Sequence, residues 1–224
     1  MKLIVATVSR SDFGIMSNLI SLLKKDKNLS VSTLVTGEHF TSKMGNTFKE
    51  IKKKFYIDKR IKLEEYSSEP NSIIKKSSEL ITKFSNYIKN NKPDLILLLG
   101  DKYEVLMIAY CAFIFRIPIA HIHGGEKTSG SLDDTFRHQI SKMADLHFVE
   151  RLEYKKRLIQ LGEDSRKISI VGSLSRENLS KLSFISKKEI EKKFSIKFFE
   201  KNIIFTYHPE TIKNVTKKKL AQIF

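Results

Sequence analysis

The order of apolar runs and amphipathic stretches constrains the fold of this chain more than any other feature. Short continuous apolar runs, bounded by Gly or polar residues, alternate with longer stretches of helical periodicity. Such runs are typical of strands buried on both faces, and their alternation with helices is typical of a parallel sheet. The sequence predicts strands at 2–8, 31–36, 94–99, 119–122, 146–149 and 167–171.

The stretches between these runs predict the helices that connect the strands. Right-handed crossovers place such helices on both faces of the sheet, and ligands collect beyond the carboxyl ends of the strands. The fold class is therefore α/β, a Rossmann-like parallel sheet with helices on both faces. The predicted helices span 14–25, 41–55, 71–90, 102–115, 132–143 and 151–161.

The pattern changes after Gly172. A Lys-rich stretch at 187–194 predicts a helix, and an apolar run at 202–206 predicts one more strand. We expect residues 1–172 to form an N-terminal α/β domain and residues 173–224 to begin a second α/β domain that is incomplete. The alternative is that residues 203–207 extend the first sheet.

Composition narrows the class of protein. Lys and Arg total 41 against 25 Asp and Glu, a net charge of +16 that attracts polyanions. The excess lies in short Lys runs on the polar side of helical patterns, with no nucleic-acid recognition pattern, so we expect a solvated surface and no nucleic-acid partner. The single cysteine, Cys111, excludes a disulfide framework. Without a signal peptide or an apolar run long enough for a bilayer, we expect a cytoplasmic protein with no membrane partner.

Two strand ends carry polar residues suited to a ligand. After the first strand come Arg10, Ser11 and Asp12, where a helix N-terminus and Arg10 would bind a diphosphate. A plain helix cap is the equal alternative, and no GxGxxG motif follows to indicate a dinucleotide. After the third strand come Asp101 and Lys102, where Asp101 either serves the chemistry or caps the next helix.

The densest group of acids and bases is the segment 121–138, HIHGGEKTSGSLDDTFRH. Adjacent carboxylates and imidazoles shift one another's pKa toward values that suit proton transfer, and a Gly pair permits close backbone approach. Four of these residues could instead bind a metal. No HExxH or CxxC spacing supports a metal site, so we expect no metal. Those four are His121, His123, Glu126 and Asp133; the candidate set also includes Asp134 and Arg137.

Three histidines lie outside this segment. His39 follows the second strand in LVTGEHF and is a candidate to line the same cleft. His208 precedes Pro209, which ends the preceding apolar run and would aim His208 into a cleft between domains. We interpret His147, which lies within a predicted strand, as a structural residue.

Five motifs together resemble the hydrolysing UDP-N-acetylglucosamine 2-epimerases. The resemblance runs from residue 2 to about residue 211 and is strongest to the bacterial branch that supplies N-acetylmannosamine for sialic acid. It implies a GT-B type fold with a UDP-sugar in the interdomain cleft, a homodimer, and no metal or redox cofactor. The motifs are SRSDFG at 9–14, TGEHF at 36–40, GDKYE at 100–104, HIHGGEKTSGSLDDTFRHQISKMADLHF at 121–148 and TYHPET at 206–211.

The resemblance also implies a mechanism, in which elimination of UDP gives an acetamidoglucal and water then adds to give N-acetylmannosamine with inverted carbon 2. Asp101 and Asp133 match acids of the reaction centre, and Arg10 and His208 match cleft residues near the phosphates. Lys102 stands where related enzymes often have Arg. His123 stands where several relatives carry a catalytic Glu, so the base remains open between His123 and Glu126.

The family's remaining UDP-binding motifs would lie beyond Phe224, so we expect this chain alone to bind UDP-sugar poorly and to turn over little or nothing. A separate chain carrying the C-terminal half would restore the site. The alternatives are a non-catalytic half-enzyme subunit, a GT-B glycosyltransferase, and an epimerase acting on a UDP-diacetamido sugar for legionaminic acid.

Overall fold

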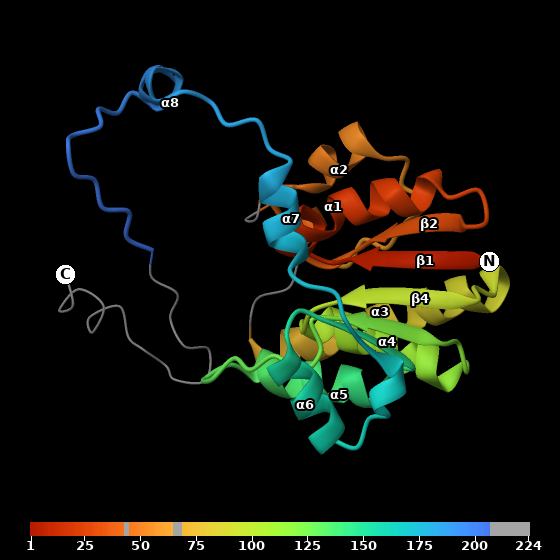
Figure 1. Ribbon diagram of the computed structural model, residues 1–224. Coiled ribbons are helices and arrows are strands. Elements are labelled where there is room, and N and C mark those ends of the chain that lie inside the picture. The colour runs from red at the N-terminus through yellow and green to blue at the C-terminus, as the bar shows by residue number, and fades with distance from the viewer. Residues whose placement is uncertain (43–44, 65–68, 207–224) are drawn as a thin grey trace.

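A computed structural model describes residues 1–42, 45–64 and 69–206, and its centre is one seven-stranded sheet (Figure 1). The strand order is β3-β2-β1-β4-β5-β6-β7, and every neighbouring pair is parallel. The six predicted strands are confirmed, and β3 is an additional short strand. The strands are β1 (Lys2–Thr7), β2 (Ser30–Val35), β3 (Lys59–Arg60), β4 (Leu95–Leu99), β5 (Ile119–Ile122), β6 (Leu146–Val149) and β7 (Ile168–Ile170).

Helices cover both faces of the sheet, as the alternation predicts (Figure 1). Because side chains along a strand point alternately to the two faces, β1 serves both layers: Leu3 and Val5 pack with one group of helices, and Ile4 and Ala6 with the other. The first group comprises α1 (Arg10–Lys25), α2 (Phe48–Lys54) and α7 (Leu174–Ser180). The second comprises α3 (Pro70–Asn91), α4 (Tyr103–Ile114), α5 (Leu132–Met143) and α6 (Leu152–Gln160).

Helix α1 begins at Arg10, four residues before its predicted start. The reason is the side chain of Asp12, which turns back and accepts hydrogen bonds from the backbone N–H groups of Val8 and Ser9, both at 2.8 Å. These bonds satisfy amides that a helix N-terminus otherwise leaves unpaired. Asp12 is thus the N3 residue of a capping box whose N-cap is Ser9, so its role in the structure is to cap α1.

The predicted helix at 41–55 is wrong in its first half. A 3-10 turn at Gly37–Phe40 precedes α2, which begins only at Phe48. Gly45 and Asn46 have φ values of +80° and +49°. A left-handed backbone cannot continue a right-handed helix, so the turn at these two residues fixes the start of α2.

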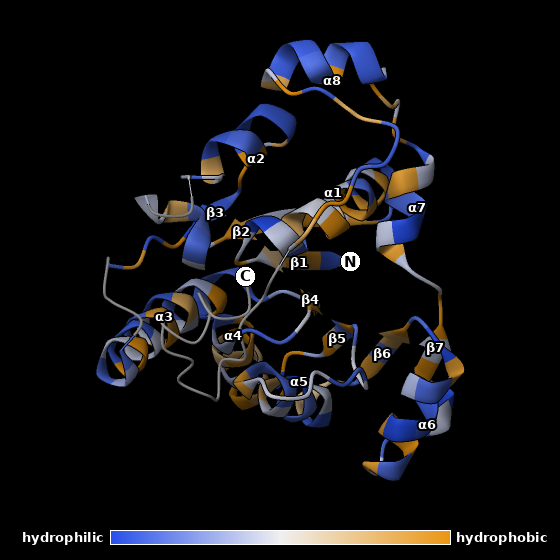
Figure 2. Ribbon diagram, turned by 90° about the vertical axis from the view of Figure 1, so that its left-hand side faces the viewer, coloured by the Kyte–Doolittle hydropathy of each residue, from blue (hydrophilic) through white to orange (hydrophobic). Residues whose placement is uncertain are grey.

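The chain beyond β7 departs most from the prediction. Helix α8 (Lys187–Phe194) forms where predicted, and Figure 2 shows it as mostly hydrophilic. The predicted strand at 202–206 is wrong: these residues form no strand, and Ile203 and Ile204 are 93% and 91% exposed. A strand needs a neighbour to bond its amides, and none lies beside this run within the described residues. The boundary at 172/173 remains a prediction.

None of the described helices has the length and apolar content needed to cross a membrane. The longest, α3, has 22 residues but carries Lys and Glu throughout. Its buried side chains, Leu80, Phe84 and Ile88, recur every four residues on one face. That spacing directs one stripe of the helix toward the sheet and leaves the rest to solvent.

The turn after β5 gives a stability prediction. A Cβ at Gly125, where φ is +73°, would lie 2.4 Å from the backbone oxygen of Tyr154 in α6. Since neither backbone can yield without moving α6, we expect Gly125→Ala to lower the free energy of unfolding by about 2 kcal/mol or more. Urea denaturation measures this change.

Gly14 supplies the matched control, because a Cβ there meets nothing within 4 Å and the residue lies inside α1. Gly14→Ala should be neutral or should raise stability by up to about 1 kcal/mol. Equal effects of the two substitutions would contradict the steric explanation.

Candidate active site

The carboxyl ends of β1 and β4 bound a cavity of about 150 Å³. These two strands are neighbours in the sheet, yet α1 covers one face and α4 the other. From β1 the chain adds strands toward one edge of the sheet, and from β4 it adds them toward the other edge. Open α/β folds bind ligands at the point between two such strands. The polar residues around the cavity are Ser9, Ser11, Asp12, Asp101, Lys102, His123 and Arg137. The structure thus brings together residues from three separate motifs.

Asp101 is held by Arg137 of α5. The Nη2 atom of Arg137 donates to Asp101 and also to Thr128 Oγ1, the latter at 3.1 Å. Arg137 is only 5% exposed, and its Nε and Nη1 atoms make no hydrogen bond within the described part of the chain. Nη1 lies 3.9 Å from Asp134 Oδ1, which is a long ion pair. Buried guanidinium N–H groups without hydrogen bonds are costly, so they favour an anionic or carbonyl group as an additional ligand.

Asp133 and Asp134 stand together at the start of α5 but have different surroundings. Ser131 caps the helix, and its hydroxyl donates to Asp133 Oδ2 at 3.1 Å. Burial raises the pKa of Asp133 above its ordinary value, although the bond to Ser131 opposes this. Asp134 accepts a 2.6 Å hydrogen bond from the Thr128 amide, and its carboxylate lies 3.9 Å from Arg137 Nη1 and 3.8 Å from His138 Nε2. Asp133 is therefore the acid better suited to exchange a proton, and Asp134 holds the loop.

His123 lies at the turn where β5 ends. Its φ of +67° is unusual for a residue with a side chain, and such strain often marks a functional site. Glu126 Oε1 lies 3.4 Å from its Nδ1. Burial raises the pKa of Glu126 even though His123 and Arg137 lower it. The two candidates for the base are thus in contact.

Lys102 and Arg10 are both paired with acids. Lys102 Nζ donates to Glu38 Oε1 at 2.6 Å; burial disfavours the ammonium charge, but Glu38 raises the pKa of Lys102 overall. The side chain of Arg10 is 75% exposed and pairs with Glu50 at 3.7 Å, so it lies outside the cavity lining. Either cation would have to leave its partner, or share it, to bind a phosphate.

His39 and His208 are not brought to the cavity by the described structure. His39 is completely buried, and its ring nitrogens lie 2.9 Å from Thr7 Oγ1 and 2.8 Å from Thr47 Oγ1. Burial lowers the pKa of His39 to about 4. The expectation that His39 lines the cleft is not met, because it joins β1 to the loop before α2 instead. His208 lies outside the described residues.

Two other histidines are buried in the sheet. His121 Nε2 donates to the Gly100 carbonyl at 2.8 Å, since a carbonyl can only accept, and Ser141 Oγ lies 3.1 Å from Nδ1. These bonds join the end of β4 to α5. His147 is 1% exposed with Glu163 Oε2 at 3.3 Å from Nε2, as suits a structural residue.

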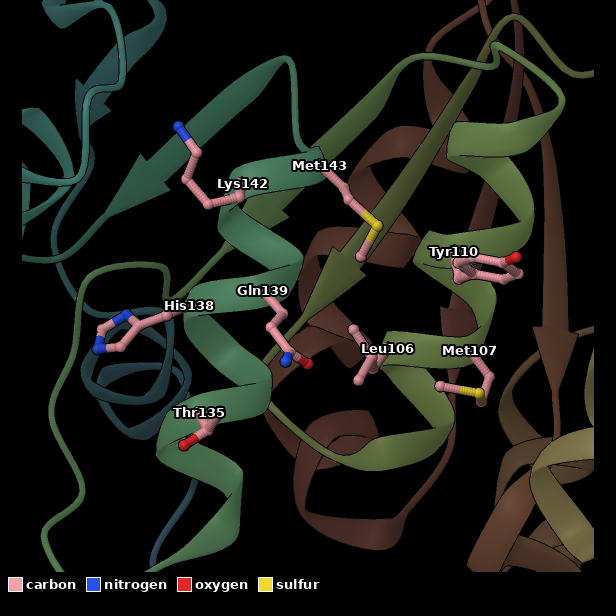
Figure 3. Close-up of a pocket in the computed structure, with 8 residues that line it drawn as sticks. All are labelled: Leu106, Met107, Tyr110, Thr135, His138, Gln139, Lys142 and Met143. Carbon is pink, nitrogen blue, oxygen red and sulfur yellow. The ribbon is translucent and has the colours of Figure 1, made fainter. Parts of the chain in front are cut away.

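A larger cavity, of about 590 Å³, lies elsewhere. It runs between α4 and α5 on the outer face of the helices, as Figure 3 shows for Leu106, Met107 and Met143. His138, the last residue of the dense segment, lines this groove and not the carboxyl edge. We place the active site at the smaller cavity because the acids and bases converge there.

The sequence analysis missed Glu150. It directly follows β6, and its Oε1 lies 3.4 Å from His123 Nε2. Among the described residues, His123, Glu126 and Glu150 form one group whose potential metal-ligating atoms all lie within 4.8 Å of one another. The available signal was its position after a predicted strand, at the same edge as the other candidates.

Comparison with known proteins decides the family. The model of the family described as UDP-N-acetylglucosamine 2-epimerase matches residues 21–224. The chain belongs to the UDP-N-acetylglucosamine 2-epimerase family. Within this family it is 37% identical to a GDP/UDP-N,N'-diacetylbacillosamine 2-epimerase (hydrolyzing) of Campylobacter jejuni subsp. jejuni serotype O:2, over 97% of this chain and 57% of that protein. It is 35% identical to the polysialic acid biosynthesis protein P7 of Escherichia coli, over 94% of this chain and 54% of that protein.

Solved structures agree with the family in fold. The Neisseria meningitidis UDP-GlcNAc 2-epimerase bound to UDP-GlcNAc superimposes with a TM-score of 0.73 at 21% identity, over 87% of this chain and 53% of that one. A lipopolysaccharide outer core galactosyltransferase superimposes less well, with a TM-score of 0.54 at 19% identity, over 77% of this chain and 45% of that one. The predicted fold, the N-terminal part of the GT-B type, is confirmed. The chain spans about half the length of the curated relatives it matches.

The burial of His121 predicts a loss of stability in mild acid. Its pKa falls from the ordinary 6.5 to about 3 in the folded chain, chiefly because burial disfavours the charged ring. The unfolded chain therefore binds the proton more tightly, so this stabilisation is complete above about pH 6.5 and is lost as pH falls toward 3. Between pH 7.5 and 5 we expect His121 to contribute a decrease of about 2 kcal/mol to the free energy of unfolding, measured with urea as the difference between wild type and a His121 variant.

His121→Gln should lower stability at pH 7.5 but reduce its dependence on pH. His39 adds to the same slope, because its pKa is lowered to about 4. The double variant should therefore show the smallest change between the two pH values. Equal pH dependence in wild type and variants would contradict the assignment.

Proposed function

We propose that this site catalyses the hydrolysing 2-epimerisation of UDP-N-acetylglucosamine, giving N-acetylmannosamine and UDP. The observation that carries the proposal is that Asp101 and His123 line one cavity at the carboxyl edge, with Glu126 at 3.4 Å from His123 and Asp133 close enough to Asp101 for the two carboxylates to interact. Elimination removes a weakly acidic hydrogen from carbon 2, and proton donors and acceptors with raised pKa values suit that step. The family membership supports the same chemistry.

The proposed reaction has two balanced steps. A base takes the proton from carbon 2, the C–H electron pair forms the double bond to carbon 1, and the C1–O pair leaves with UDP. Water then adds its hydroxyl to carbon 1 and a proton to the opposite face of carbon 2, which inverts that centre. Arg137 orients Asp101, and its Nε and Nη1 atoms, which make no hydrogen bond in the described part of the chain, are available to oxygen atoms of the substrate.

The cavity encloses only part of such a substrate. Its 150 Å³ is below the roughly 300–1,000 Å³ typical of ligand pockets. This agrees with a site that is completed by a facing surface. Lys102 in the cavity lining and the exposed Arg10 are the cations that we propose meet the nucleotide. We therefore propose the assay both with the 224-residue chain and with this chain joined to the second half of the C. jejuni relative.

A UDP-diacetamido sugar is the second candidate substrate. Its specific support is that two relatives, at 37% and 32% identity, are named as N,N'-diacetylbacillosamine 2-epimerases. The two substrates share the 2-acetamido group and the hydrogen on carbon 2, and differ at carbon 4. Parallel kcat/KM measurements with both sugars decide between them, and the larger value identifies the substrate.

Turnover in heavy water tests the chemistry together with Asp133. We expect UDP release with deuterium incorporated at carbon 2, detected by NMR. Asp133→Asn should lower kcat by about 10²- to 10⁴-fold, the usual contribution of a general acid or base. Asp26→Asn, at the exposed C-terminal end of α1, is the matched control and should leave kcat unchanged.

Release of UDP without deuterium at carbon 2 would exclude elimination. Transfer of the sugar to an acceptor, with no free sugar formed, would favour a glycosyltransferase. No reaction in the joined protein, with a native melting transition, would refute the proposed function.

We further propose that the chain forms a homodimer, as the family resemblance implies. Three apolar side chains on α4 support an interface there: Tyr110, Phe113 and Ile114 are 47%, 55% and 58% exposed, beside the groove between α4 and α5. Contiguous exposed apolar surface commonly marks an association site, and self-association by a two-fold axis is the commonest form. Sedimentation should show a dimer that Phe113→Glu disrupts; a wild-type monomer would contradict the proposal.

A further inference from the structure

Glu150 meets His123 because their strands are neighbours. β5 and β6 pair in parallel, and the His123 amide extends this ladder by donating to the Phe148 carbonyl at 3.1 Å. The next residues of each strand end leave the sheet at the same edge. Glu150, two residues after Phe148, therefore reaches the ring of His123 from the side opposite Glu126.

The His123 ring lies between two carboxylates, each facing a different nitrogen. Nδ1 is 3.4 Å from Glu126 Oε1, and Nε2 is 3.4 Å from Glu150 Oε1. The three side chains are only 14%, 23% and 16% exposed, so solvent competes little for these contacts. Nε2 is buried without a hydrogen bond within the described residues. Catalytic hydrogen bonds are often long in unliganded enzymes and shorten when substrate binds.

The chemistry of imidazole restricts how this arrangement works. A neutral ring has one N–H group and one lone pair, and an ionised carboxylate can only accept. If Glu150 is ionised, the hydrogen belongs on Nε2, and the Nδ1 lone pair then faces Glu126. Burial raises the pKa of Glu126, so this carboxylate binds a proton more readily, and a proton that arrives during the reaction can lie between Glu126 and Nδ1.

We propose that Glu150 is a positioning residue that fixes the Nε2–H tautomer of His123, so that Nδ1 and Glu126 together accept the proton from carbon 2. The proposal rests on the proposed function. The C–H electron pair forms the C1–C2 double bond and UDP leaves with the C1–O pair, as above. The proton ends on the Glu126–Nδ1 pair, and the Glu150 carboxylate offsets the positive charge of the imidazolium that forms.

Glu150→Gln tests the proposal because it keeps the size of the side chain but removes its charge. In the joined protein we expect kcat to fall by about 10- to 100-fold with KM changed less than about twofold, as for an interaction made mainly in the transition state. Glu153→Gln is the matched control, since Glu153 lies exposed in the first turn of α6. It should leave both constants unchanged.

Nitrogen-15 NMR of the ring gives a readout that a merely structural role would not change. The wild-type chain should show His123 as the Nε2–H tautomer. Glu150→Gln should lose this preference, because an amide can present either a donor or an acceptor, and Glu153→Gln should keep it. Glu150→Asp, which retains the charge on a shorter side chain, should partly restore both the tautomer and kcat.

Two results would overturn the proposal. One is a Glu150→Gln variant with native melting, wild-type kcat and an unchanged tautomer. The other is one equivalent of Zn²⁺ or Mn²⁺ retained by the wild-type chain after dialysis and lost in the variant, which would assign the three residues to a metal site. Since the NMR experiment needs no turnover, an inactive protein with the expected tautomers would refute the proposed function and leave the geometry standing.

Discussion

Parallel pairing of the strands is the constraint on which the rest of this structure depends. A buried strand must bond its amides to its neighbours, and in a parallel sheet every strand then ends at the same edge. The loops after β1, β4, β5 and β6 therefore lie along one edge, although they come from distant parts of the chain. Asp101 and His123 line one cavity, and His123 contacts Glu150, because their strands are neighbours in the sheet.

Buried polar groups beneath this edge keep the loops in place. Asp12 caps α1, His39 ties β1 to the following loop, and His121 ties β4 to α5. Each is buried at a cost in desolvation, which their hydrogen bonds offset. The dense segment thus combines two kinds of residue: His121 supports the site, whereas His123 and Glu126 face its chemistry.

Family membership supports the fold of this chain, and the geometry of the site supports the roles of individual residues. The family establishes the fold and the class of relatives, but the chain spans about half of their length. The geometry distinguishes the roles of two acids that are adjacent in one motif, because Asp133 is partly buried and interacts with Ser131 and Asp101, whereas Asp134 binds the Thr128 amide. The geometry also shows that Glu150 is a partner of His123, the residue that stands where the resemblance leads us to expect a Glu.

The sequence by itself determined the α/β fold, six of the strands and the segment that carries the chemistry, because apolar periodicity and motif spacing are properties of contiguous residues. It also predicted α5 and α8 at their observed bounds. Only the tertiary structure decided that Asp12 caps α1, that His39 is buried, that residues 202–206 form no strand, and that Glu150 reaches His123. These outcomes depend on strand register, local backbone dihedrals and the presence of a neighbouring strand, which no stretch of sequence specifies alone.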